Sequence, residues 1–287
     1  MAKDTKYGIR ELQAEFPTQD ACLDYLFDTL HSRKCSCDGR YARINGRKQF
    51  QCSKCRYQIA PMAGTLFEKS TSPLSLWFHA IFIFSNAKSG ISAKEMERQL
   101  NVTYKTAWRI LKLIRASLKQ DTRPLSGMVE MDEAFFGGKG VGGKYNKNQK
   151  KIMEDKAKVI AAVERGGEMR AKKVSDVSSQ TIGSFLEDNV RPDGTCLMTD
   201  ESNRYDKVAV GYDRLTVNHS KKKYAVDGIH INHIESFWAH VKRSIKGTHK
   251  VVSKKHLQEY LDGFVFHYNN RGNDKERFAS LLLAIVR

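Results

Sequence analysis

The sequence predicts a multidomain protein of mixed α/β class, with a small cysteine-rich β module and a helical region followed by a larger α/β domain. Three observations support this prediction. Four of the six cysteines fall between residues 35 and 55, residues 69–120 show the apolar period of helices, and strand-like segments alternate with helices after the polar, Pro- and Gly-containing stretch 119–127. The expected divisions are an N-terminal helical segment (1–32), the β module (33–68), a helical domain (69–120) and the α/β domain (127–287).

The charge of the chain predicts a polyanionic partner. It has 49 Lys and Arg against 32 Asp and Glu, a formal net charge of +17, and 40% hydrophobic residues, too many for a disordered basic tail. Nucleic acid and an anionic membrane surface are the two candidates, and we favour double-stranded DNA. The longest apolar run, Leu76–Phe84, falls far short of the roughly 20 residues that span a bilayer, so no membrane association is expected. The start of the chain has no apolar secretory segment, which predicts a cytoplasmic protein with reduced cysteines.

The clustered cysteines predict a zinc-ribbon-like module. Cys52 and Cys55 have the two-residue spacing that chelates tetrahedral Zn²⁺, and Cys35 and Cys37, separated by one residue, supply the second pair. Four reduced thiols without metal remain the alternative, and His31 could replace one thiol of the first pair. Between the pairs, alternating basic and apolar residues around Asn45-Gly46 predict a β-hairpin. Its basic side chains are candidate DNA contacts, with simple solvation as the alternative: Arg43, Arg47 and Lys48.

Residues 69–120 predict a helix-turn-helix. Ser72-Pro73 opens a first, apolar helix, and Ser92 with Glu95 forms an expected capping box for a second, short helix. Asn101-Val102 makes the turn, and Thr103 caps a third helix whose outward face is basic and aromatic. We expect that face to enter a DNA groove, against the alternatives that it is only solvated and that its tryptophan packs on a neighbouring helix. Its residues are Lys105, Trp108, Arg109 and Lys112.

The α/β domain has the strand order of a ribonuclease H-like sheet. Three strands form a meander, and a helix, a fourth strand, a short fifth strand and two helices follow, an order that makes the first and fourth strands neighbours. The expected strands are 128–136, 157–165, 169–177, 195–199 and 215–217, with a turn at 191–194, and the expected helices are 180–190, 234–245 and one around 257–268.

A glycine-rich stretch between the first two strands contains the letters of two phosphate-binding motifs. Neither motif holds, because Tyr145 follows Lys144 where a phosphate loop needs Ser or Thr, and no helix start follows. We interpret residues 137–156 as a basic loop in which Lys139 and Lys144 are candidate DNA contacts, with simple solvation as the alternative.

Three acidic residues are placed for metal-dependent chemistry. Asp132 lies within the first strand, Asp200 ends the fourth, and Glu235 lies on the following amphipathic helix. Clustered carboxylates need cations, and two Mg²⁺ or Mn²⁺ ions about 4 Å apart activate a water or hydroxyl and stabilise the leaving oxygen in phosphodiester cleavage. With 32 acidic residues, such a triple can also arise by chance. Glu133 and Glu201 are expected to point to the opposite side because side chains alternate along a strand.

The flanks of Glu235 suggest supporting roles on the same helix. Asn232 lies one helical turn earlier and could position a phosphate or water. Lys242, Arg243 and Lys246 continue the helix and are candidate contacts to the DNA backbone, against the alternative of a solvated face.

Four segments together resemble the DDE transposases of the ISXO-like insertion sequences, a family related to Merlin transposons. They are residues 130–138, 199–202, 232–243 and 268–271, and the junction 64–69 resembles the same family's passage from zinc ribbon to helical domain. The resemblance covers nearly the whole chain. It implies a ribonuclease H-like core in which Asp132, Asp200 and Glu235 bind metal and catalyse cleavage of transposon ends and their transfer to target DNA.

The resemblance also sets expectations for partners and location. Cutting and joining two DNA ends implies at least a homodimer on DNA, and we expect a nucleoid-associated protein of a bacterial host. Two other functions remain open at this point. One is a DNA-binding regulator whose ribonuclease H-like domain is not catalytic, and the other is a nuclease that cleaves without strand transfer.

Overall fold

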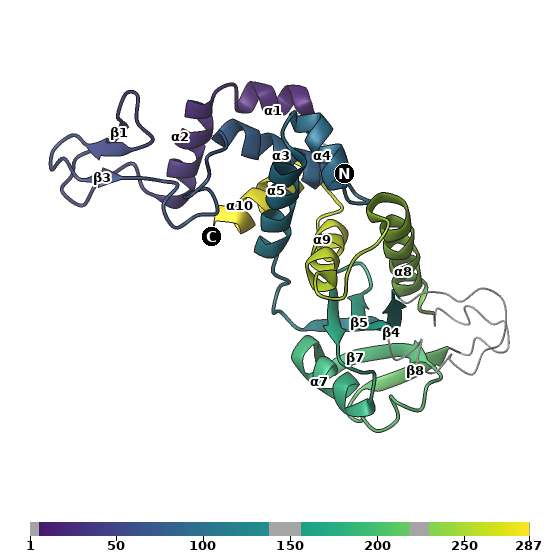
Figure 1. Cartoon of the computed structure of the whole chain (residues 1–287). Coiled ribbons are helices and arrows are strands. Elements are labelled where there is room, and N and C mark those ends of the chain that lie inside the picture. The colour runs from purple at the N-terminus through teal and green to yellow at the C-terminus, as the bar shows by residue number, and fades with distance from the viewer. Residues whose placement is uncertain (1–5, 138–155, 218–229, 287) are drawn as a thin grey trace. The chain divides into compact units, whose positions relative to one another are not determined.

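The computed structural model describes residues 6–137, 156–217 and 230–286 and divides the chain into two compact units (Figure 1). The first unit comprises residues 1–118 and 270–287, and the second comprises residues 119–269. The C-terminal segment therefore belongs to the first unit, whereas the sequence had suggested one domain from 127 to 287.

The β module of the first unit is a small antiparallel sheet next to a helical pair. Its strand order is β1-β2-β3, and Phe27 of α2 lies with its ring centroid 4.1 Å from that of Phe50 of β2. The Thr18 hydroxyl caps α2 by accepting a hydrogen bond from the Ala21 N–H at 3.2 Å. The elements are α1 (Ile9–Glu15), α2 (Gln19–Leu30), β1 (Tyr41–Arg43), β2 (Phe50–Cys52) and β3 (Gln58–Ile59).

The predicted pair of helices joined by a tight turn is present as α4 and α5, preceded by the apolar helix α3. Asn101 ends α4 in the left-handed conformation (φ 51°), and the Ser92 and Thr103 hydroxyls cap α4 and α5. The full capping box is wrong, because the Glu95 carboxylate bonds Gln99 and Arg98 instead of reaching back to Ser92. The bounds are α3 (Leu74–Asn86), α4 (Ala93–Leu100) and α5 (Tyr104–Ser117).

The last helix, α10 (Asp274–Val286), completes the first unit and was not predicted. Arg277 is fully buried and donates hydrogen bonds to the Ser85 carbonyl at 3.2 Å and the Asn270 carbonyl at 2.9 Å. The Phe278 ring lies 5.3 Å from that of Tyr7. Burying a charge that satisfies two backbone carbonyls fixes this helix against α3.

The second unit has the five-stranded sheet order β6-β5-β4-β7-β8. β4 to β6 are antiparallel, and β7 and β8 add in parallel to β4, so the predicted ribonuclease H-like arrangement, with first and fourth strands adjacent, is confirmed. The expected turn at 191–194 is instead an irregularity within β7, where Gly194 has φ 71°. The strands are β4 (Leu125–Phe136), β5 (Ala157–Glu164), β6 (Met169–Val174), β7 (Val190–Asp200) and β8 (Asp213–Val217).

Helices cover both faces of this sheet (Figure 1). Val129 and Met131 of β4 pack towards α7 on one face, while Ala134 and Phe136 pack towards α8 and α9 on the other. This alternation places even-numbered residues of β4 on the side of α8. The helices are α7 (Ser179–Asn189), α8 (Asn232–Ser244), the π-helix η2 (Ile245–His249), which was not predicted, and α9 (Leu257–Asn269).

Candidate active site

The candidate active site lies where β4 and β7 separate. Their parallel pairing ends at Glu130 and Met198, and Asp132 and Asp200 each lie two residues further along their strands. Both therefore project on the α8 side. Donor oxygens of Asp132, Asp200 and Glu133 all lie within 4.8 Å of one another. The structure thus brings together two of the three predicted carboxylates and adds Glu133, which the sequence analysis had assigned to the opposite side.

The electrostatics of the site fit a cation. Burial, together with the charges of Asp200 and Glu235, raises the pKa of Asp132 to about 6, although a hydrogen bond from the Glu133 backbone and the charge of Lys242 act in the opposite direction. Burial and the charges of Asp132 and Asp200 raise the pKa of Glu133 to about 7. Crowded, partly desolvated carboxylates disfavour ionisation unless a positive charge joins them. A hard divalent ion with oxygen ligands suits this donor set.

Glu235 lies on the first turn of α8 with an exposed side chain. Its charge acts on Asp132, which places it in the surroundings of the cluster. It does not belong to the group of oxygens within 4.8 Å. Asn232, the first residue of α8, is likewise exposed.

Glu130 joins β4 to the start of α8. Its carboxylate is fully buried and accepts hydrogen bonds from the backbone N–H groups of His233 at 2.9 Å and Ile234 at 3.2 Å. These are free N–H groups of the first helical turn, where a negative charge also meets the positive end of the helix dipole. Glu130 lies two residues before Asp132 in β4. It thereby fixes the end of α8 that carries Glu235 to the strand that carries Asp132.

Arg165, just after β5, completes this anchor. Its Nε donates to Glu130 Oε1 at 2.7 Å, and its Nη2 donates to the His230 carbonyl at 2.7 Å. The Nδ1 atoms of His230 and His233 also lie near Glu130 Oε1, at 3.3 and 2.8 Å. The Arg165 guanidinium already neutralises the Glu130 carboxylate and bonds to it. We therefore interpret Glu130, Arg165, His230 and His233 as an ion pair that caps α8, and not as a second metal site.

The four clustered cysteines have the geometry of a zinc site. All four sulfur atoms lie within 4.8 Å of one another, with Cys35 and Cys55 at 3.7 Å and Cys37 and Cys52 at 3.4 Å. A tetrahedral site with Zn–S bonds near 2.3 Å separates its sulfurs by about 3.8 Å. A hydrogen bond from the Cys37 backbone and one from Tyr41 lower the pKa of Cys35 to about 6, which favours the thiolate that binds metal. The one-residue spacing is therefore compatible with zinc, and His31 is not part of the group.

The comparisons decide the family. A family model for the ISXO2-like transposase domain matches residues 124–269. The chain belongs to this family. An uncharacterized protein in transposable element ISH50 of Halobacterium salinarum is 26% identical over 239 residues, which cover 78% of this chain and 80% of that protein. That relative is archaeal, so it does not support the expected bacterial host.

Two solved structures resemble the chain weakly. The simian T-cell lymphotropic virus intasome, in complex with a PP2A regulatory subunit, shows 10% identity and a TM-score of 0.32 over 66% of this chain and 69% of that one. The Mos1 strand transfer complex shows 11% identity and a TM-score of 0.31 over 72% and 74%. Likeness at this level adds nothing to the assignment, which rests on the family model and the sheet topology.

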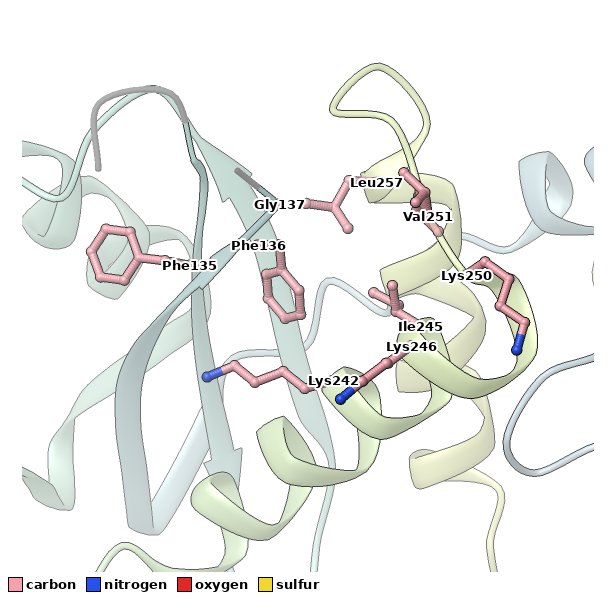
Figure 2. Close-up of a pocket in the computed structure, with 10 residues that line it drawn as sticks. Phe135, Phe136, Gly137, Lys242, Ile245, Lys246, Lys250, Val251 and Leu257 are labelled. Carbon is pink, nitrogen blue, oxygen red and sulfur yellow. The ribbon is translucent and has the colours of Figure 1, made fainter. Parts of the chain in front are cut away.

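A groove lies at the end of β4 in this ISXO2-like transposase domain. It has a volume of about 730 Å³ between the end of β4 and the α8–η2 segment. Phe136 and Ile245 form apolar walls, and Lys242 extends from α8 towards the strand (Figure 2). Lys246 and Lys250 also line it, the latter without having been singled out in the sequence. Arg243 is exposed on the same helix, and the candidates Lys139 and Lys144 lie outside the described residues.

The outward face of α5 is exposed within the first unit. Trp108 is 42% exposed, so the alternative that it packs on a neighbouring helix is wrong, and the Lys112 ammonium lies 5.3 Å from its ring centroid. Lys105 and Arg109 are exposed on the same helix. Tyr104, 47% exposed one turn before Trp108, extends this face and was missed.

Of the hairpin residues, one already has an intramolecular partner. The Arg43 guanidinium lies 2.9 Å from the Asp20 carboxylate of α2. It therefore serves first to hold the β module on α2. Arg47 and Lys48 are exposed at the tip of the hairpin.

Among the described residues, every helix is too short or too polar to span a bilayer.

Proposed function

We propose that this chain is the transposase of an insertion sequence, which binds the element's DNA ends, cuts the phosphodiester bond there and joins the freed 3′ end to target DNA. The observation that carries the proposal is the group of acidic oxygens at the separation of β4 and β7, within a chain of the ISXO2-like transposase domain family. In this proposal Asp132, Asp200 and Glu235 are the catalytic acids.

The residues of the site divide the work of the reaction. Asp132 and Asp200, on adjacent strands, would hold divalent ions together with Glu235 from α8, and Glu130 and Arg165 keep that helix in place. Mg²⁺ or Mn²⁺, two per site, supplies activation of the attacking oxygen and stabilisation of the leaving one when bound. Asn232 is proposed to orient a phosphate or water from the same helix.

The basic surfaces are proposed to hold the DNA. The groove at the end of β4, with Lys242 and Lys246, would take the DNA strand that flanks the scissile phosphate, and Arg243 would contact the backbone of that strand. The outward face of α5 and the tip of the zinc-ribbon hairpin would bind the element's end. Since two ends are cut and joined, we infer that the protein acts as a homodimer or larger assembly on DNA.

The experiment compares binding, cutting and joining by the full-length protein. The substrate is a labelled duplex carrying the element's end, and the variants are Asp132→Asn and Asp200→Asn. Both variants should bind the duplex as the wild type does and fail to cleave it in Mg²⁺ or Mn²⁺. Full cleavage by either variant would contradict the assignment of the acids.

The same assay separates the other functions. A regulator with an inert domain binds and never cleaves, even as the wild-type protein. A nuclease cleaves but does not join a duplex supplied with a free 3′-hydroxyl end to target DNA. Joining by the wild-type protein is the result that the transposase proposal requires.

A further inference from the structure

Glu133 reaches the acidic group although its strand position points it away. Asp132 and Glu133 pair with Ala161 and Ile160 of β5 in regular register, so their side chains start on opposite faces of the sheet. A donor oxygen of Glu133 nevertheless lies within 4.8 Å of donor oxygens of Asp132 and Asp200. The pairing of β4 with β7 has ended by this point, so the longer glutamate side chain can reach the gap between the two strands.

One oxygen of this carboxylate lacks a partner. Glu133 Oε1 is shielded from solvent and has no hydrogen-bond partner among the described residues. A buried carboxylate oxygen without a donor is costly, and two neighbouring carboxylates add repulsion. Two positive charges offset part of this negative charge. The charge of Lys242 acts on Asp132, and the charge of Arg204 acts on Glu133.

A second, independent group points to the same position. Tyr205, in the turn after β7, is fully buried, and its hydroxyl has no hydrogen-bond partner among the described residues. The phenol faces Glu133, and the charges of Glu133, Asp132 and Asp200 all act on it. The Arg214 guanidinium lies over its ring at 5.3 Å from the centroid, which fixes the ring in place. Unsatisfied buried groups of this kind indicate a missing ion or water.

We propose that Glu133 is a further ligand of the divalent ions held by Asp132 and Asp200. In the ion-bound site, the Tyr205 hydroxyl, which has no partner in the described structure, donates a hydrogen bond to the Glu133 carboxylate and so positions it. Each hard divalent ion of this kind takes one or two carboxylates, so a two-ion site has room for four. Asp132, Asp200, Glu235 and Glu133 supply that number. The proposal rests on the proposed function and adds to it a residue outside the predicted triad.

The test measures Mn²⁺ affinity, independently of catalysis. Full-length wild-type protein and the variant Glu133→Gln are titrated with Mn²⁺, and free Mn²⁺ is followed by electron paramagnetic resonance. Glu133→Gln should weaken binding by about tenfold or more, as expected for the loss of a ligand. Glu201→Gln, which removes an exposed carboxylate next to Asp200, is the matched control and should bind within about twofold of the wild type. Wild-type affinity in Glu133→Gln overturns the proposal.

Two further variants separate coordination from charge and from folding. Glu133→Asp keeps the charge but shortens the side chain by one methylene, so it should also lose affinity if the carboxylate is a ligand. An affinity equal to the wild type would show that only charge matters and would overturn direct ligation. Tyr205→Phe should weaken Mn²⁺ binding severalfold, and an unchanged affinity would remove the positioning role. The Tm without metal should not fall in Glu133→Gln, since the substitution removes a buried charge.

The outcome is distinguishable from failure of the proposed function. If Asp132→Asn also binds Mn²⁺ like the wild type, the metal site itself is misplaced. If Asp132→Asn loses binding and Glu133→Gln retains it, the site stands and only the role of Glu133 is rejected.

Discussion

Glu130 and His233 lie 103 residues apart in the chain, yet the Glu130 carboxylate accepts the His233 backbone N–H at 2.9 Å and lies 2.8 Å from its imidazole Nδ1. This contact ties the strand that carries Asp132 to the helix that carries Glu235. The geometry of the acids therefore depends on a buried ion pair that itself does no chemistry.

We expect Glu130→Gln to loosen the start of α8. The substitution leaves Arg165, whose side chain is 13% exposed, without its counter-charge, which typically costs about 3 kcal/mol. Hydrogen exchange followed by mass spectrometry should show faster exchange in residues 230–240, and cleavage should fall with it. Glu187→Gln, on the exposed side of α7, is the control and should change neither. Unchanged exchange at α8 in Glu130→Gln would show that the cap is dispensable.

The raised pKa values predict how stability depends on pH without metal. Asp132 and Glu133 have pKa values of about 6 and 7 in the folded protein, above the values of 3.8 and 4.5 of the free groups. The folded state therefore binds more protons, and stability falls as pH rises from about 4 to about 7. Asp132→Asn should remove about 3 kcal/mol of this fall, since one pKa unit corresponds to about 1.4 kcal/mol. Urea unfolding at several pH values in this range, without added Mg²⁺, measures the free energy of unfolding. If this free energy falls with pH in parallel for the variant and the wild type, the prediction is contradicted.

Gly39 should be essential for the zinc module. A Cβ at this position would overlap the Cys52 sulfur and lie 3.1 Å from the Lys54 Cβ. Gly39→Ala therefore displaces a ligand, and zinc content measured by mass spectrometry should fall well below the wild-type value. Gly272→Ala, where a Cβ meets nothing within 4 Å, should keep its zinc. Full zinc occupancy in Gly39→Ala would count against the four-cysteine site.

Binding of the element's end should depend on the exposed face of α5. Lys105→Ala and Arg109→Ala should each lower the slope of log affinity against log salt by about 0.9, the value for one released phosphate counterion. Trp108→Ala should weaken binding without a change in Tm, because the residue is already 42% exposed. Lys69→Ala, an exposed lysine before α3, is the control and should leave the slope unchanged. Fluorescence anisotropy at several salt concentrations measures all four.

The sequence predicted the strand order and the positions of Asp132 and Asp200, because alternation and turn residues are local signals. It missed that the Glu133 carboxylate joins those of Asp132 and Asp200. This position depends on where the pairing of β7 with β4 ends, which no local pattern encodes. It missed the place of α10 for the same reason, since the buried Arg277 is explained only by the Ser85 carbonyl far along the chain. It correctly placed Arg43 on the hairpin, but it did not predict the ion pair of Arg43 with Asp20, because Asp20 lies on a different element, α2.

The assignment of the acids is tested most directly by the yield of 3′-hydroxyl ends from a duplex carrying the element's end, with wild-type protein, Asp132→Asn and Asp200→Asn in Mg²⁺. We predict that all three bind the duplex alike and that each variant yields about a thousandfold fewer cleaved ends, as loss of several kcal/mol of transition-state stabilisation requires. Cleavage by either variant at the wild-type rate would contradict it.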